Sequence, residues 1–233
     1  RLEADGLLDS TMIVFTSDNG SNMGHHGIVG KGNGTYPMNM YETSVKVPGI
    51  FAWPGHIPQG VVSQTMVSHY DFMPTLLEMC GVPYQPKKEL PGRSFARVLT
   101  GESDSFRDEV VVYDEYGPVR MIRTRRWKYV ARIPSGPDEL YDMINDPGEK
   151  NNRIHDPALA DVRCRLRSEL QIWFAKWVDP AIDGSHELNT GYGQLCRPGV
   201  YSEGKPVFAE EDSFRKASEQ AANELKLETG EQP

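Results

Sequence analysis

The sequence lacks long hydrophobic runs and clustered basic charge. No apolar stretch of about eighteen residues, the length needed for a membrane-spanning helix, occurs among its 233 residues. Its formal net charge of -8 argues against sequence-independent binding to nucleic acid, which requires gathered Lys and Arg side chains. With 38% hydrophobic and 25% charged residues, the composition is that of a globular protein. We therefore expect neither a membrane span nor a nucleic-acid partner.

Cysteine is also scarce, with Cys80, Cys164 and Cys196 widely separated. This spacing excludes a dense disulfide framework and a zinc site built from neighbouring cysteines. One bridge with a free thiol remains compatible with the sequence, but we favour three unpaired thiols that are buried or half-buried. The cysteines leave the redox compartment open.

The first half of the chain has the pattern of an incomplete α/β domain. Residues 1–8 have no basic-then-apolar leader pattern and no initiator Met, and they resemble the end of a helix. The apolar run over residues 11–16 lacks polar alternation, which predicts a buried parallel strand with helices on both faces. Such a strand needs neighbours, so we expect the chain to be part of a longer protein.

Residues 17–58 have a loop composition rich in Gly, Pro and Asn, and a loop of that length favours a functional role. A helix is predicted over residues 67–80, because Ser68 can cap it and Gly81 can end it. His69, beside this helix, is interpreted as structural. Residues 83–107 are predicted to form a connector.

The second half of the chain predicts a small sheet covered by one helix. Strands are predicted over residues 109–113, 119–133 and 140–142. A helix over residues 158–177 has apolar residues spaced by three or four and should cover that sheet. The expected divisions are residues 1–107, 108–178 and an extended tail over 179–233, with a polar helix as an option at 213–227.

Asp18 and Asn19 directly follow the first predicted strand, where open α/β sheets place ligands. Carboxylate and amide oxygens suit Ca²⁺ or Mg²⁺ and are poor ligands for zinc. Taken alone, however, a Ser-Asp-Asn-Gly segment is more often an ordinary turn.

Several further segments lie in a fixed order around this one. They are Thr16-Ser17-Asp18-Asn19-Gly20, Met23-Gly24-His25-His26-Gly27, Gly30-Lys31-Gly32, Tyr41-Glu42 with Val47-Pro48, Asp71-Phe72-Met73-Pro74-Thr75-Leu76-Leu77, and Glu139-Leu140-Tyr141-Asp142 with Asn145-Asp146-Pro147. Together, across residues 7–177, they resemble the carboxyl-terminal half of the sulfatase family. The resemblance implies the last part of an alkaline-phosphatase-like mixed α/β sheet flanked by helices, followed by a small antiparallel sheet packed with one helix.

The resemblance also implies roles for individual residues. Asp18 and Asn19 would bind the metal, Ca²⁺ or alternatively Mg²⁺, and Lys31 would bind the sulfate of a sulfate ester substrate during catalysis. His26 would face the substrate as a catalytic and binding residue. His25 would lie beside it, where relatives often carry Glu, so we expect a changed substrate preference. Glu42 is expected to anchor the loop by hydrogen bonding.

The family's nucleophile is a formylglycine made within a Cys/Ser-x-Pro-x-Arg motif. None of the three cysteines has Pro two places on and Arg four places on. The resemblance therefore implies that an amino-terminal half supplies the formylglycine and two further aspartates, and that this chain alone is inactive. Family habit implies an extracytoplasmic location.

Two alternatives stay open. One is a phosphate ester hydrolase of the same superfamily, which Asn19 disfavours because phosphatase-like relatives usually carry His there. The other is a non-catalytic fragment or pseudoenzyme that binds sulfated glycans. The sequence does not identify the substrate, and sulfated glycan is the preferred class.

Overall fold

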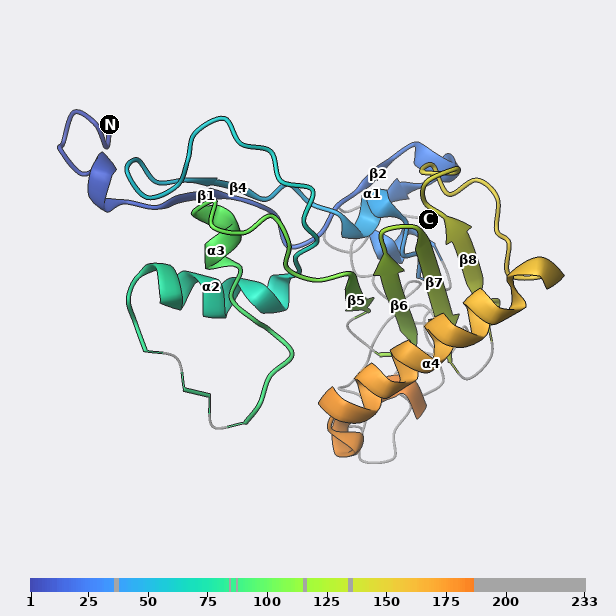
Figure 1. Cartoon of the computed structure of the whole chain (residues 1–233). Coiled ribbons are helices and arrows are strands. Elements are labelled where there is room, and N and C mark those ends of the chain that lie inside the picture. The colour runs from blue at the N-terminus through green and yellow to red at the C-terminus, as the bar shows by residue number, and fades with distance from the viewer. Residues whose placement is uncertain (36–37, 84, 87, 115–116, 134–135, 187–233) are drawn as a thin grey trace, which may run out of the picture.

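The computed structural model describes residues 1–35, 38–83, 85–86, 88–114, 117–133 and 136–186. Figure 1 shows two parts side by side. One part holds strands β1 and β4 with helices α2 and α3, and the other holds a four-stranded sheet with helix α4. The predicted tail beyond residue 186, including Cys196 and the optional helix at 213–227, lies outside the described residues.

The first predicted strand forms, but its partner and burial differ from the prediction. β1 (Ile13–Phe15) pairs antiparallel with β4 (Ile50–Ala52), and Val14 lies opposite Phe51. The side chains of Ile13 and Phe15 are 41% and 62% exposed rather than buried. An apolar run indicates a tendency to burial, but it does not define strand direction or which layer covers the strand. Residues 2–6 form turns instead of a helix end, followed by a 3-10 helix at Leu8–Ser10.

The predicted helix over residues 67–80 is confirmed, with α2 at Phe72–Met79 after a 3-10 turn at His69–Asp71. Ser68 and the buried Asp71 form a capping box, in which the Ser68 backbone N–H donates to Asp71 Oδ2 at 2.9 Å. Gly81 follows with a φ of 66°, the left-handed conformation that ends many helices. The predicted connector contains α3 (Ala96–Leu99).

The glycine-rich loop is built from short elements. They are β2 (Asn22–Met23), a 3-10 helix at His25–Gly27, β3 (Val29–Gly30), a 3-10 helix at Gly32–Gly34 and α1 (Glu42–Val45). β2 and β3 pair antiparallel. The described part of the segment therefore contains short regular elements despite its loop composition.

The second part is an antiparallel sheet of strands in sequential order. They are β5 (Glu109–Tyr113), β6 (Val119–Thr124), β7 (Trp127–Arg132) and β8 (Glu139–Asp142). The single strand predicted over residues 119–133 was wrong, because a tight turn divides it into β6 and β7. At this turn Trp127 N–H donates to Thr124 Oγ1 at 3.0 Å. The turn contains no Gly, Pro or Asn, so the strand-like pattern continues across it.

Helix α4 (Ala160–Trp177) covers one face of this sheet, as predicted (Figure 1). A 3-10 turn at Pro157–Leu159 precedes it, with Asp156 accepting a hydrogen bond from Ala158 N–H. Buried Leu166, Leu170 and Phe174 pack with sheet residues such as Ile122 and Leu140. The opposite face is buried by Met40 against Val119, Met121 and Val130. The sheet is thus enclosed on both sides.

The exposure of two cysteines differs from the sequence prediction. Cys80 and Cys164 are unpaired but exposed, so the expectation of burial was wrong for these two thiols. Cys164 lies within α4, and Cys80 directly follows α2. Within the described ranges, no helix combines the length and apolar character needed to cross a membrane.

Asp142, at the end of β8, provides a test of the sheet's pH dependence. Burial alone would raise its pKa, but hydrogen bonds from Arg126, Asn145 and the Ile144 backbone lower the pKa to about 2. Because the folded-state pKa lies below the unfolded value of about 3.9, the carboxylate stabilises the fold above that pH. This stabilisation should be lost as pH falls towards 2.

We expect Asp142→Asn to lower the free energy of unfolding at pH 7 and to reduce its decline between about pH 4 and 2. Urea unfolding over this pH series measures both quantities. Glu3→Gln, which neutralises an exposed carboxyl, is the control and should keep the wild-type profile. A wild-type profile in Asp142→Asn would contradict the assigned role.

Candidate functional site

Asp18 and Lys31 are brought together at the candidate site. Asp18 follows β1, and its Oδ2 lies 3.9 Å from Lys31 Nζ. Its Oδ1 accepts hydrogen bonds from Asn19 N–H at 2.9 Å and from Ser17 Oγ at 3.1 Å. These hydrogen bonds, first that of Asn19, lower the pKa of Asp18, so the carboxylate is ionised at neutral pH. Both charged side chains are exposed, at 79% for Asp18 and 59% for Lys31.

Asn19 adds a second oxygen donor beside Asp18. Its Nδ2 donates to Gly20 O at 2.7 Å, and within the described part of the chain no hydrogen bond engages its Oδ1. A carboxylate oxygen and an amide oxygen on adjacent residues fit a hard cation such as Ca²⁺. Ca²⁺ takes about six to eight oxygen ligands, and no group of three or more His, Cys, Asp or Glu suited to a metal occurs among the described residues. These two residues therefore fit part of a coordination sphere.

Gly20 holds the turn that follows Asp18 and Asn19 against α1. Its N–H donates to Ser44 O at 2.9 Å. A Cβ at this position would lie 2.1 Å from Thr43 O, which no real side chain tolerates. Glycine is therefore required by close backbone approach.

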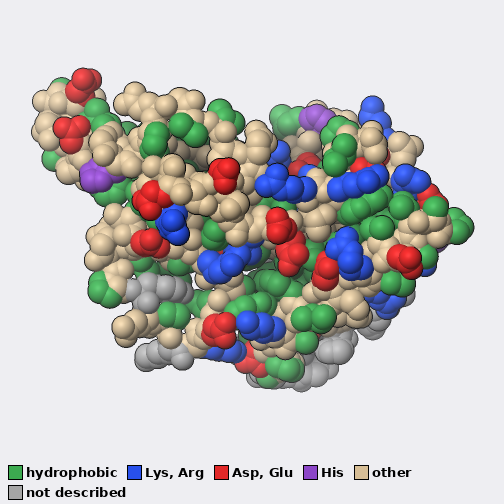
Figure 2. Space-filling view, viewed as in Figure 1, with side chains coloured by type: hydrophobic (Ala, Val, Ile, Leu, Met, Phe, Trp, Pro, Cys, Tyr) green, Lys and Arg blue, Asp and Glu red, His purple; other side chains and the backbone are tan. Residues whose placement is uncertain are grey.

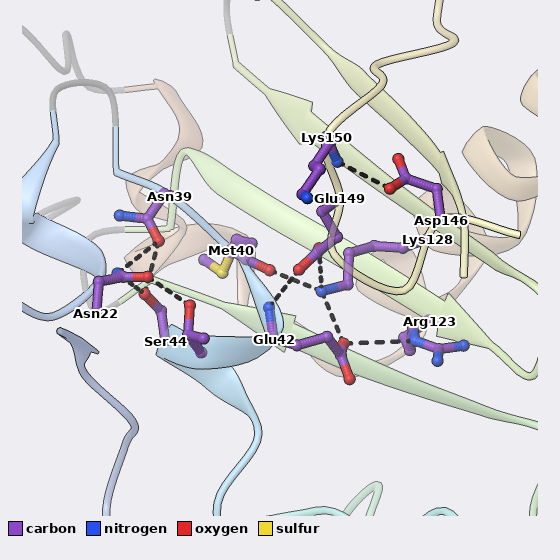
Figure 3. A network of polar contacts seen from close by, with 11 residues as sticks. Asn22, Asn39, Met40, Glu42, Ser44, Arg123, Lys128, Asp146, Glu149 and Lys150 are labelled. Carbon is purple, nitrogen blue, oxygen red and sulfur yellow. Dashed lines mark hydrogen bonds and ion pairs between the residues drawn. The ribbon is translucent and has the colours of Figure 1, made fainter. Parts of the chain in front are cut away.

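A buried amide network holds the two site loops together (Figure 3). Asn22 is fully buried, and its Nδ2 donates to Ser44 Oγ at 2.6 Å and to Gly30 O at 3.3 Å. Its Oδ1 accepts a hydrogen bond from Thr43 Oγ1. Ser44 Oγ in turn donates to Asn39 Oδ1 at 2.6 Å. The network joins the strand after Asp18 to the segment that precedes α1.

Asn39 carries the network to the lysine loop. Its Nδ2 donates to Gly32 O at 3.1 Å and contacts Lys31 O at 3.4 Å. The Asn39 N–H donates to Gly32 O as well, at 2.9 Å. The backbone on both sides of the Lys31 side chain is thereby positioned. Sequence reasoning missed Asn22, Asn39 and Ser44, since their separations of 17 and 5 residues follow no local pattern.

A buried ion cluster anchors α1 to the sheet (Figure 3). Lys128 on β7 is fully buried, and its Nζ lies 2.7 Å from Glu42 Oε1, 2.6 Å from Glu149 Oε1 and 3.0 Å from Met40 O. Burial would raise the pKa of Glu42, but Lys128 and Arg123 outweigh it and lower that pKa. Burial raises the pKa of Glu149. The expected anchoring role of Glu42 agrees with these contacts.

The structure shows no direct contact that would tie His26 or His25 to the charged pair within the described residues. His26 adopts a left-handed φ of 55° and stacks on Tyr41, with ring centroids 3.7 Å apart and planes 6° from parallel. No hydrogen bond or ion pair within the described ranges joins it to Asp18 or Lys31. His25 is exposed in the same 3-10 turn. Their substrate-facing roles therefore stay predictions. His69 Nε2 lies 2.8 Å from Ser17 O, in agreement with a structural role.

The fold is similar to that of a 2-O GAG sulfatase and of a phosphonate monoester hydrolase, so the chain has part of an alkaline-phosphatase-like α/β fold. A family model described as N-sulphoglucosamine sulphohydrolase, C-terminal, matches residues 34–176. The chain belongs to this family of sulfatases. The resemblance to the carboxyl-terminal half of a sulfatase is thereby confirmed.

Individual relatives agree with this assignment. The uncharacterized sulfatase YidJ of Escherichia coli K12 is 33% identical over 74% of this chain and 34% of its own length. The structure of BT4656 in complex with its substrate D-glucosamine-2-N,6-O-disulfate matches with a TM-score of 0.65 and 31% identity, over 75% of this chain and 36% of that one. A phosphonate monoester hydrolase of Agrobacterium radiobacter matches with a TM-score of 0.62 and 30% identity, over 76% and 38%. The chain spans about a third of the length of these proteins.

The amide network should contribute measurably to stability. We expect Asn22→Ala to lower the free energy of unfolding by about 2–4 kcal/mol, because it leaves buried partners such as Ser44 and Thr43 unsatisfied. Urea unfolding at pH 7 measures the change. Asn33→Ala, an exposed asparagine in the same loop region, should change stability by less than about 0.5 kcal/mol. Equal effects of the two substitutions would contradict a structural role for the network.

Proposed function

We propose that this chain forms the carboxyl-terminal half of a divalent-cation-dependent sulfuric ester hydrolase. The observation that carries the proposal is the placement of the Asp18 carboxylate 3.9 Å from the Lys31 ammonium, with the Asn19 amide beside them. A cation site next to a fixed ammonium group suits a sulfate ester, whose negative charge shifts towards the bridging oxygen as the ester bond to sulfur breaks. Membership of the sulfatase family supports the same reaction.

Each residue has a distinct proposed role. Asp18 and Asn19 hold Ca²⁺, with Mg²⁺ as the alternative, and a bound cation would supply Lewis-acid stabilisation of sulfuryl oxygens. Lys31 binds a sulfate oxygen through its charged amino group. His26 and His25 lie on the adjacent 3-10 turn and contact the substrate. The stacking of His26 on Tyr41 would hold its ring in one orientation.

The proposed activity needs an amino-terminal half. The chain covers 34% of the length of the Escherichia coli relative, and a formylglycine on the other part would supply the nucleophile. Ile13, Phe15 and Ile50 present an exposed apolar surface on β1 and β4 to which that half would pack. Burying these side chains would stabilise the assembly by the hydrophobic effect.

A sulfated glycan is the proposed substrate class. The structurally similar BT4656 was determined with D-glucosamine-2-N,6-O-disulfate as its substrate, which supports this choice. An extracytoplasmic location of the protein is proposed along with it. Such a substrate offers both an anionic group for Lys31 and hydroxyl groups for the histidine turn.

A phosphate ester hydrolase is the second candidate, favoured by the similarity to a phosphonate monoester hydrolase. Assaying the complete protein with matched sulfate and phosphate esters of one alcohol separates the two. Higher kcat/KM for the sulfate ester supports the sulfatase, and the reverse supports the second candidate. Glycan binding without turnover of either ester would indicate a pseudoenzyme.

We expect Lys31→Ala to lower kcat/KM of the complete protein by about a hundredfold or more, because a charge-stabilising contact to the reacting group is lost. Sulfate release from a sulfated sugar measures the effect. Lys46→Ala, which removes an exposed lysine after α1, should retain activity. Wild-type rates in Lys31→Ala would remove Lys31 from the site. Turnover by the present chain alone would contradict the need for a separate nucleophile.

We expect Asp18→Asn to weaken Ca²⁺ binding by at least about tenfold, because one anionic ligand becomes neutral. Calorimetric titration of the complete, chelator-treated protein with Ca²⁺ measures the affinity. Asp9→Asn, in the 3-10 turn before β1, is a matched control with the same charge change and should bind as the wild type does. An unchanged affinity in Asp18→Asn would refute the ligand assignment.

A further inference from the structure

A cavity of about 580 Å³ lies between α4 and the four-stranded sheet. Its walls include the rings of Tyr129 and Phe174, the side chain of Leu170, and the guanidinium groups of Arg163 and Arg167. This size falls within the range of small-molecule binding sites. Figure 2 shows that Lys and Arg side chains are frequent on the half of the molecule that holds these elements.

The cavity is separate from the Asp18–Lys31 site. Side chains alternate between the two faces of β7. Lys128 and Val130 face Met40 and the site loops, whereas Tyr129 belongs to the core cluster shared with α4. The four-stranded sheet therefore stands between the cavity and the residues around α1.

Two cationic groups of this cavity have no carboxylate partner in the part of the chain that the structure describes. Arg163 donates through Nη1 to Ile154 O at 2.7 Å, and within the described residues Arg167 makes no hydrogen bond or ion pair. The two residues are one helical turn apart, a spacing at which like charges destabilise a helix. On the outer side of the same helix, Arg165 is paired with Glu169 at 2.9 Å. Among the residues with a described placement, Arg165 is thus paired with a carboxylate, whereas Arg163 and Arg167 are not.

The other charged groups of the cavity have partners among the described residues. Arg120 forms an ion pair with Asp183 and lies over the Phe174 ring, 3.8 Å from its centroid. Asp138 accepts hydrogen bonds from the Tyr129 hydroxyl at 2.6 Å and from Arg132 N–H at 3.1 Å. Both donors to Asp138 are neutral, so this carboxylate keeps its charge, while Arg132 is paired with Glu139 at 3.0 Å. Among the described residues, the four arginines of the cavity therefore exceed the carboxylates Asp183, Glu139 and Asp138 by one positive charge, which an anion would balance.

The apolar walls indicate which kind of molecule would carry the anionic group. Tyr129, Leu170 and Phe174 offer ring and aliphatic surface next to the two guanidinium groups. The carbon-hydrogen face of a sugar ring can pack on such a surface while a carboxylate or sulfate substituent binds the arginines. We propose that this cavity binds an anionic sugar residue, carboxylated or sulfated, at a site distinct from Asp18 and Lys31. The proposal holds whether or not the Asp18–Lys31 site is catalytic.

Calorimetric titrations of the full chain with glucosamine 6-sulfate and with glucuronate test the proposal. We expect saturable binding of at least one of the two, weakened about tenfold or more in Arg163→Gln/Arg167→Gln. Arg165→Gln carries the same kind of charge change on the same helix and should bind as the wild type does. Lys31→Ala, which removes the proposed sulfate contact of the other site, should retain the binding that depends on Arg163 and Arg167, and this distinguishes the cavity from the proposed catalytic site.

Three results would overturn the proposal. They are absence of binding to the wild-type chain, equal affinity in the double variant, and loss of binding in Lys31→Ala. Inorganic sulfate is titrated separately, and an affinity equal to that of the sugars would overturn the role of the apolar walls. Arg167→Gln alone removes an exposed side chain that has no hydrogen bond or ion pair with the described residues, so it should keep the fold and still weaken binding. Failure of sulfatase turnover would leave these binding results unaffected.

Discussion

The buried ammonium group of Lys128 is the interaction on which the candidate site depends. It joins β7 to Glu42, Glu149 and the Met40 carbonyl, three acceptors from two distant parts of the chain. A fully buried lysine is costly unless its charge is balanced and its hydrogen bonds are satisfied. Here two carboxylates and one carbonyl meet that requirement. Removal of any one of these acceptors would leave the buried ammonium group incompletely paired. The sheet and α1 are therefore held in one arrangement.

Hydrogen bonds, rather than ion pairs, connect this arrangement to the candidate site. From α1, Ser44 contacts both Asn22 and Asn39, and these two asparagines hold the backbone near Asp18 and Lys31. Buried amides that are fully hydrogen-bonded define a single loop conformation, because every alternative leaves a polar group unsatisfied. Met40 packs this segment against the sheet, and the amide network fixes the backbone of the loops beyond it. A rigid sheet thus positions two exposed charged side chains.

Short-range sequence patterns correctly predicted several elements of the structure. The capped helix at Ser68, the helix that covers the sheet and the Asp18–Asn19 turn were all visible in the sequence, and the family resemblance added Lys31. Long-range features were not visible. The hydrogen bonds that place Lys31 depend on Asn39, and Lys128 reads as an ordinary lysine on a strand, although it contacts a carbonyl 88 residues away. The direction of β1 and the turn before Trp127 were missed because composition records burial tendency but neither pairing nor a turn without Gly or Pro.

The exposure of the Asp18–Lys31 pair has a consequence for binding. An ion pair between side chains 79% and 59% exposed, 3.9 Å apart, stabilises a protein by no more than about 1 kcal/mol. The attraction between the two side chains therefore does not fix their positions. The surrounding backbone positions them. Because the mutual attraction is weak, a cation can bind the carboxylate and an oxyanion can bind the ammonium group with little loss of interaction energy. Had the two groups been buried against each other as Lys128 and Glu149 are, separating them would cost several kcal/mol and would oppose both ligands. The buried Lys128–Glu149 ion pair thus lies in the supporting structure, whereas the proposed ligand site holds a weak, exposed ion pair.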